Sequence, residues 1–532
     1  MPRVAPEDRK RVYCPKRRTG CLTCKRIERR VKCSEERPAC ARCTSTGRLC
    51  DGYGDPPSSR PTTSRSNVFP RPLLARPLSI PSYNLFTCDQ ERRSFHFFLS
   101  KTVPQLAGDF ECAFWERLLL QSAHHEPAIC HVTVALGSLH ELFESNPKSP
   151  FPLATQTAHK SFALRQYLRA LRCLMPAPGS TQPMDVCLIS SVLFACFEAM
   201  RGQYAPAITH IASGLKILGE LRTNPSATLS VGRTPYIPME TLCGLFTRLQ
   251  GQVITLHRGA ARSNIWPQLV IDLDQPIIFN SLADARETLE IYTFYYRQHT
   301  TEPSPTPTTP PSTPSPPLNP AAVTLRDTCL ILLSRWSTAL ETFLRDRTTT
   351  LTPRERRATA LLQLRKIDCV VALDSLQAAG EAEAGNRVQW DEYCSLFEQM
   401  VALGESIIES PAREMKQTFS LDLGIIPTMF NVAIRCRDPF IRRRAVNVLR
   451  ASAVQEGVWN SGVVAAVAEK WIEIEEEGLG EVVSCADVPD SARLADCLPV
   501  FDAERPTAVV YFKREAPFYE EYGGVRREVF TW

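Results

Sequence analysis

The stretch GCLTCKRIERRVKCSEERPACARCTSTGRLC, residues 20–50, contains six cysteines, many basic residues and no histidine. The cysteine spacing is Cys21-x2-Cys24-x8-Cys33-x6-Cys40-x2-Cys43-x6-Cys50. A C-x-x-C pair followed by a third cysteine therefore occurs twice. So short a segment cannot bury enough apolar surface to fold alone, and metal binding would have to supply its folding free energy.

The spacing of the cysteines predicts zinc. Two thiolates that are close in sequence can occupy adjacent corners of a tetrahedral Zn²⁺ site, as C-x-x-C pairs do. One Zn²⁺ ion needs four ligands, so six thiolates are two too many. Two ions need eight ligand positions, which six thiolates supply if two of them bridge. The internal repeat makes Cys21 and Cys40, the first cysteine of each half, the predicted bridges between two Zn²⁺ ions.

Disulfides and other zinc fingers are the alternatives. The first residues, MPRVAPEDRKR, contain no apolar segment of the kind found in secretory signals. The longest apolar run, CLISSVLFACF (187–197), is too short to span a bilayer. Without a sign of export, the 20 cysteines are expected to be thiols or metal ligands, and no membrane partner is expected. A finger of the C₂H₂ or RING type needs histidines, and the first one is His96.

The charge is unevenly distributed along the chain. The net charge of the 532 residues is +5, but residues 1–50 carry 15 Lys+Arg against 5 Asp+Glu. The remaining residues carry 47 against 52. A basic N-terminal part on a mildly acidic body predicts a polyanionic partner.

Residues 21–50 resemble the fungal zinc binuclear cluster, a DNA-binding module. The matching features are the paired C-x-x-C halves, the basic stretch before the third cysteine, Pro38, and the closing C-x6-C followed by DGY. The resemblance implies a nuclear transcription factor that reads CGG-like triplets in double-stranded DNA. It also implies the metal ligands Cys21, Cys24, Cys33, Cys40, Cys43 and Cys50.

One departure from the family concerns the segment between the second and third cysteines. The family usually has six residues there, whereas KRIERRVK has eight. Two extra helical residues rotate the rest of the segment by about 200°. Counting back from Cys33 reproduces the family's ending with Arg29, Arg30 and Lys32, so the insertion is placed next to Cys24. A misplaced exon boundary would give the same spacing, and sequencing the transcript distinguishes the two.

The first half of the cluster is expected to bind DNA, because five of the eight residues between Cys24 and Cys33 are Lys or Arg. Arg29, Arg30 and Lys32 are expected in the major groove, where they can meet guanine O6 and N7. Lys25 and Arg26 are expected to contact phosphates or solvent.

The segments around the cluster are predicted to be extended. Residues 1–20 form a basic arm whose Arg9-Lys10-Arg11 and Lys16-Arg17-Arg18 clusters fit nuclear import and phosphate contact. Residues 51–88 form a flexible Pro/Ser-rich linker. Many members of the family dimerise through a coiled coil here, but the seven prolines of residues 51–82 exclude a heptad repeat. A homodimer is therefore an open expectation.

Residues 89–532 are expected to form a large all-α domain. Apolar residues recur with helical periodicity in segments such as 127–143, 184–200, 358–373 and 456–478. Residues 301–320, TEPSPTPTTPPSTPSPPLNP, contain nine prolines and are predicted to form a disordered loop. The body resembles, more loosely, the helical regulatory domain of fungal zinc-cluster factors. The resemblance implies regulation and contact with the transcriptional machinery.

No catalytic residue is predicted. The segment HHEPAICH (124–131) superficially resembles a zincin motif, but four residues separate Glu126 from His131 where the motif needs two. Walker, G-x-S-x-G and G-x-G-x-x-G motifs are absent from the sequence. These histidines are therefore expected to be surface residues or hydrogen-bonded core residues.

The sequence thus predicts a sequence-specific transcription factor, with a regulated secondary-metabolite gene cluster as a family-level expectation. Two alternatives remain at this point. One is a zinc-dependent protein-interaction scaffold without DNA specificity, which the basic arm disfavours. The other is an enzyme in the helical body, which the missing motifs disfavour.

Overall fold

The computed structural model describes residues 21, 23, 33–34, 36, 38–47, 49–50, 86–144, 153–175, 182–223, 235–256, 275–299, 320–345, 347, 350–381, 390–409, 417–514 and 526–532. The chain divides into two units, Met1–Leu78 and Ser79–Trp532. The first unit contains the helix α2 (Ala41–Ser45). The second unit is a mostly helical body, as the sequence predicted.

The body begins with helices that are interrupted by two π-helical turns. These elements are α3 (Asp89–Phe97), η2 (Phe98–Thr102), α4 (Val103–Ala107), η3 (Phe114–Leu118), α5 (Leu119–Ala123), α6 (Pro127–Glu144), α7 (Leu153–Leu174), α8 (Met184–Met200), α9 (Tyr204–Thr223) and α10 (Met239–Leu256). The later helices are α11 (Leu282–His299), α12 (Pro320–Arg345), α13 (Pro353–Glu381), η5 (Trp390–Tyr393), α14 (Cys394–Ile408), α15 (Ile426–Arg435), α16 (Pro439–Ser452), α17 (Ser461–Glu476) and η6 (Cys485–Asp487).

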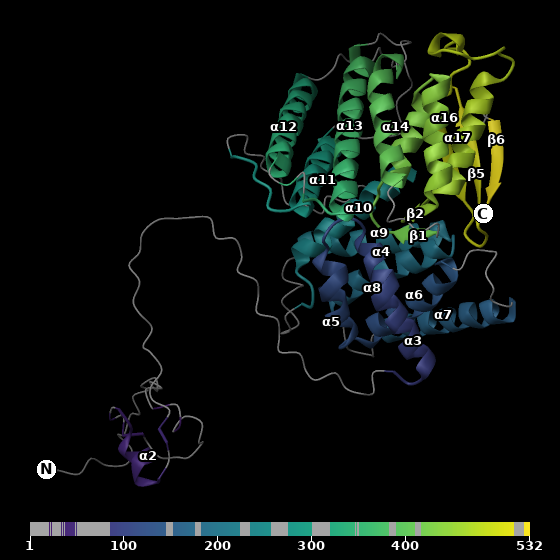
Figure 1. The fold of residues 1–532 in the computed structure, drawn as a ribbon. Coiled ribbons are helices and arrows are strands. Elements are labelled where there is room, and N and C mark those ends of the chain that lie inside the picture. The colour runs from purple at the N-terminus through teal and green to yellow at the C-terminus, as the bar shows by residue number, and fades with distance from the viewer. Residues whose placement is uncertain are drawn as a thin grey trace, which may run out of the picture. The chain divides into compact units, whose positions relative to one another are not determined.

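Helix α8 lies at the centre of the first half of the body. Its sequence, MDVCLISSVLFACFEAM, is apolar on nearly all sides, which is typical of a helix surrounded by other elements. Residues 188–200 are all buried, and α8 packs against α6 and α9. In Figure 1 these helices occupy the lower part of the body. Their side chains belong to one large hydrophobic core that continues into α14, α15 and α16.

The second half of the body is a row of helices. Figure 1 shows α12, α13, α14, α16 and α17 one after another, and neighbouring members of this row are in contact. The row ends at a sheet of three antiparallel strands, whose strand β6 contacts α17. A separate hydrophobic cluster fills the space between α17 and this sheet, with Trp471, Val510 and Phe512 among its members.

The prediction of an all-α domain was wrong for two small sheets. One contains β1 (Thr418–Ser420), β2 (Val454–Glu456) and β3 (Trp459–Asn460). The other contains β4 (Asp496–Phe501), β5 (Thr507–Lys513) and β6 (Arg526–Thr531), paired antiparallel throughout. Strand β5 alternates buried and partly exposed residues, which is the period of a half-covered strand. A strand of 7 residues contains too few repeats of this alternation to stand out beside the longer helical periods.

Gly202 lies in the turn between α8 and α9. Its φ angle is +72°, a conformation that glycine adopts without strain. The indole Nε1 of Trp532 donates a hydrogen bond to the Gly202 carbonyl oxygen at 3.2 Å. A Cβ atom at residue 202 would lie 2.6 Å from that nitrogen, so the close approach also requires glycine.

Parts of the predicted linker and loop lie outside the described residues. Of the linker 51–88, the structure describes Phe86, Thr87 and Cys88. The Phe86 and Phe95 rings lie 5.0 Å apart, and Glu91 accepts hydrogen bonds from Thr87, so this end of the linker already contacts α3. Of the loop 301–320, only Pro320 is described, and it begins α12.

A buried histidine connects the first helices to the first sheet. His140 on α6 is fully buried; its Nδ1 lies 2.9 Å from the Thr102 hydroxyl, and its Nε2 lies 2.9 Å from the Gln105 Oε1. The same Gln105 oxygen accepts the backbone N–H of Phe419 on β1. Because the Gln105 Oε1 can only accept, His140 donates from Nε2. Burial lowers the pKa of His140 and keeps the ring neutral near pH 7, so Nδ1 accepts from the Thr102 hydroxyl.

A buried carboxylate connects α16, α17 and the segment before β4. Glu475 on α17 is fully buried, and its oxygens lie 3.0 Å from Arg437 Nη2 and 2.7 Å from Arg442 Nη2. It also accepts the backbone N–H of Leu494 at 2.9 Å. The two arginine side chains are themselves almost fully buried, so each charge in this cluster depends on the others.

We expect His140 to make the stability of the body depend on pH. Burial lowers the pKa of His140 from 6.5 to about 4. Between these values the unfolded chain binds more protons than the folded chain, so the free energy of unfolding falls as the pH decreases from 6.5 towards 4. The full effect is about 3 kcal/mol. It can be measured by urea denaturation across this pH range.

His140→Gln keeps a donor and an acceptor but does not titrate, so the fall in stability should be smaller in this variant. The control is His96→Gln, because His96 is exposed on α3. The assignment of the pH dependence to His140 would be contradicted if His140→Gln kept the full fall.

We expect Glu475→Gln to lower the free energy of unfolding by about 3–5 kcal/mol, because it removes the buried carboxylate that pairs with both Arg437 and Arg442 and leaves Arg442 only its 3.8 Å contact with Glu476. The matched control is Glu469→Gln on the same helix, because Glu469 pairs with Arg450 where both side chains are about half exposed. Exposed pairs contribute about 0–1 kcal/mol. Chemical denaturation measures both losses, and equal losses in the two variants would refute the structural role of Glu475.

Candidate metal centre

The described cysteines of the N-terminal unit gather around the start of helix α2. Cys40 is the N-cap residue of α2, and its Sγ accepts the backbone N–H of Cys43 at 3.3 Å. This is the position that Ser, Thr, Asn or Asp occupies in most helix caps. The C-x-x-C spacing therefore has a second role, because it places the first sulfur at the helix N-terminus and the second one turn later.

Four sulfur atoms form a group with the dimensions of a metal site. The Sγ atoms of Cys21, Cys40, Cys43 and Cys50 all lie within 4.8 Å of one another, and the first three residues are buried. The Sγ of Cys21 lies 3.6 Å from that of Cys40 and 3.9 Å from that of Cys43. A tetrahedron with metal–sulfur bonds of about 2.3 Å has sulfur–sulfur edges of about 3.8 Å. The four-cysteine cluster could therefore bind a tetrahedral metal ion.

The two halves of the cysteine repeat make equivalent hydrogen bonds. The backbone N–H of Cys21 donates to the Sγ of Cys33 at 3.5 Å, and the backbone N–H of Cys40 donates to the Sγ of Cys50 at 3.5 Å. In each half, the first cysteine thus contacts the third. The separations along the chain are 12 and 10 residues, so Cys33 keeps the equivalent position although its half is two residues longer.

The chemistry of the donor set also fits a soft metal ion. Cys21, Cys33, Cys40, Cys43 and Cys50 are all present as thiols and none is in a disulfide. The Thr23 hydroxyl donates to the Leu49 carbonyl oxygen at 3.3 Å, which connects the beginning of the unit to its end. Thiolate sets of this kind select zinc and iron–sulfur clusters over hard cations such as Mg²⁺.

All the predicted DNA-contacting residues lie outside the described part of the chain. These are Lys25, Arg26, Arg29, Arg30 and Lys32, together with the predicted ligand Cys24 and the arm 1–20. Their placement stays a prediction. The described helix α2 carries one basic residue, the exposed Arg42.

The histidines of the body are placed as the sequence predicted. His124 and His125 are exposed, and the His125 ring stacks on Tyr236. His131 lies 2.7 Å from the Gln166 Oε1, and His140 is buried and hydrogen-bonded. The zincin-like segment therefore does not bring its histidines together around a metal. Within the described ranges, none of the helices has the length and apolar character needed to cross a bilayer.

Two known proteins are similar to part of this chain. The Aspercryptin biosynthesis cluster-specific transcription regulator atnN of Emericella nidulans is 26% identical over 260 residues, which cover 45% of this chain and 40% of that protein. Transcription regulator lscL of Purpureocillium lilacinum is 30% identical over 199 residues, which cover 35% of this chain and 45% of that protein. The chain thus spans less than half the length of these relatives.

No family model and no solved structure matches the chain. The evidence for its family is therefore the cysteine cluster together with these two relatives. The resemblance to fungal zinc-cluster transcription factors is confirmed, because the relatives are named as fungal transcription regulators and the cysteines near the N-terminus form a cluster consistent with such a factor.

Proposed function

We propose that this chain is a sequence-specific DNA-binding transcription regulator of the fungal zinc-cluster type. The observation that carries the proposal is the group of four sulfur atoms within 4.8 Å, which includes both cysteines predicted to bridge two ions. The names of the two relatives support a role in transcription regulation rather than catalysis.

The metal centre would contain two Zn²⁺ ions. Cys21, Cys40, Cys43 and Cys50 would hold one ion between their four sulfur atoms. Cys21 and Cys40 would also bind the second ion, together with Cys24 and Cys33. The contact between the Cys21 N–H and the Cys33 sulfur supports this second group. Bound zinc would fold the unit, because so short a segment has little apolar surface to bury.

The DNA-reading face would lie in the first half of the module. Arg29, Arg30 and Lys32 would contact base edges of CGG-like triplets in the major groove, and Lys25 and Arg26 would contact phosphates. The second half, with Arg42 on a helix of five residues, offers little positive charge and would serve mainly as scaffold.

The body would regulate the DNA-binding unit and contact the transcriptional machinery in the nucleus. The Emericella nidulans relative is named as a biosynthesis cluster-specific regulator, and this name supports a role in one secondary-metabolite pathway. The alternative is a zinc-dependent interaction scaffold without DNA specificity. A scaffold would bind DNA, if at all, with the same affinity for CGG-containing and random duplexes.

We expect the full chain to bind two zinc ions in its N-terminal unit. Cys40→Ser should reduce the zinc content by two ions, because Cys40 would be a ligand of both. Zinc can be counted by elemental analysis of the purified protein. The control is Cys88→Ser, since Cys88 is exposed and lies outside the cluster. Loss of a single zinc ion from Cys40→Ser would contradict the bridging role.

We expect Arg30→Ala and Lys32→Ala to reduce discrimination between specific and random DNA by about 1–3 kcal/mol, because they remove base contacts. Arg17→Ala with Arg18→Ala should weaken both kinds of binding alike and lower the salt slope by about one unit for each phosphate that is no longer neutralised. Competition binding at two salt concentrations measures both effects. If only the arm variants relaxed specificity, the reading face would lie elsewhere.

A further inference from the structure

A largely apolar cavity of about 280 Å³ lies between α15, α17 and the sheet β4–β6. Phe430 and Ile434 of α15 and Val463, Val467 and Trp471 of α17 line one side. Residues of the sheet, Phe501, Val510 and Phe530 among them, line the other. Binding sites for small molecules are typically concave, mostly apolar and furnished with a few polar groups, and this cavity is near the lower end of their usual size range.

Four buried polar groups around this cavity can donate hydrogen bonds. The hydroxyl of Tyr204, the indole Nε1 atoms of Trp459 and Trp471, and the Nε of Arg437 are buried and have no hydrogen-bond partner within the described part of the chain. All four residues line the cavity. A buried donor without a partner loses its hydrogen bonds to water without replacement, so four around one cavity need an explanation.

The charges around the cavity disfavour an ionic occupant. The positive charge of Arg437 is already paired with Glu475 at 3.0 Å, and the Arg435 guanidinium lies 4.5 Å from the centre of the Trp390 ring. The one carboxylate among the described lining residues, Asp496, is almost fully buried, and its Oδ1 accepts the N–H of Cys497. An anion would therefore meet arginines that are already engaged. A cation would have to be desolvated among aromatic rings with a single carboxylate nearby.

We propose that this cavity binds a neutral, mainly aromatic small molecule that carries carbonyl or ether oxygens as hydrogen-bond acceptors. The aromatic walls match the apolar body of such a molecule, and the indole donors of Trp459 and Trp471 match its acceptors. The ligand contacts helices on one side and the sheet on the other. Its binding therefore stabilises the packing of the sheet against α15 and α17.

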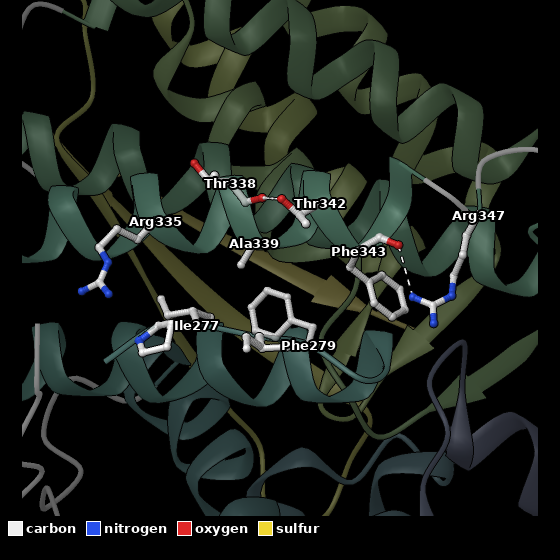
Figure 2. Close-up of a pocket in the computed structure, with 10 residues that line it drawn as sticks. Ile277, Phe279, Arg335, Thr338, Ala339, Thr342, Phe343 and Arg347 are labelled. Carbon is white, nitrogen blue, oxygen red and sulfur yellow. Dashed lines mark hydrogen bonds between the residues drawn. The ribbon is translucent and has the colours of Figure 1, made fainter. Parts of the chain in front are cut away.

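A second pocket, of about 380 Å³, provides the internal control. Figure 2 shows Ile277 and Phe279 across this pocket from Ala339 and Phe343, with Arg335 and Arg347 at its two ends. The Arg347 guanidinium lies 4.1 Å from the centre of the Phe343 ring. The apolar rim of this second pocket is exposed to solvent, since Ile278 is 75% accessible. Among the described residues, no side chain that lines this pocket has a buried polar atom without a hydrogen-bond partner.

The test uses the full chain and the neutral fluorescent ketone prodan, a naphthalene with one carbonyl acceptor. We expect saturable binding of one prodan per chain, with blue-shifted emission and a raised melting temperature. Val463→Phe should fill the cavity and weaken binding at least tenfold. Ala339→Phe should fill the second pocket and leave binding unchanged. Non-saturable binding, or binding lost only in Ala339→Phe, would overturn the proposal.

The indole donors are tested by Trp459→Phe and Trp471→Phe, which keep an aromatic ring but remove the N–H. At least one should weaken prodan binding about five- to tenfold, as expected for one buried hydrogen bond. These variants decide the question if circular dichroism shows that Val463→Phe does not fold. Unchanged affinity in both would overturn the assignment of the donors and, with it, the proposed ligand class.

Discussion

The buried carboxylate of Glu475 is the interaction on which the second half of the body depends. Two arginines that are almost fully buried share this carboxylate, and it also accepts the backbone N–H of Leu494. Arg442 has a second, longer contact of 3.8 Å with Glu476. A packing that separated the arginines from Glu475 would leave uncompensated charge in the interior, which is far more costly than a gap between apolar side chains. The cluster therefore fixes where α16, α17 and the segment before β4 meet. Arg437 and Leu494 also line the cavity beside the C-terminal sheet, so the cluster helps to define its shape.

The N-terminal unit is stabilised by a different kind of interaction. Among its described residues, the buried side chains are Cys21, Cys40 and Cys43, with Cys33 and Cys50 packed against them, so sulfur atoms lie where a larger domain has apolar side chains. The repeated N–H···S contact in the two halves fits this arrangement, because a thiolate that binds a metal gains further stabilisation from backbone donors. In the proposed zinc-bound unit, the geometry would be set by coordination preferences rather than by the amount of apolar surface.

Long helices such as α8 and α17 were predictable from the sequence. Helix α17 buries a face that recurs every three or four residues, and α8 is a long apolar segment that is buried on nearly all sides. The cluster of Cys21, Cys40, Cys43 and Cys50 was predictable because ligand spacing is local. The strands β4–β6 were not predictable, because a short strand contains few repeats of the two-residue alternation of buried and exposed side chains. The donors around the cavity were not predictable either. Tyr204 lies far from the two tryptophans in the sequence, and Trp459 precedes α17 whereas Trp471 lies within it. Only the packing of α9, α17 and the sheet brings the three side chains to one cavity.

The contact between Gly202 and Trp532 also constrains how the sequence can diverge. The two positions lie 330 residues apart, yet the indole nitrogen rests against the space that a Cβ at residue 202 would occupy. The φ angle of +72° favours glycine at residue 202 whatever residue stands at 532, so a change at 532 removes only the indole contact. Homologous chains that pair the α8–α9 turn with the end of β6 in this way should therefore keep glycine at position 202 wherever they keep tryptophan at 532, whereas glycine should remain at 202 even in chains that have lost the tryptophan.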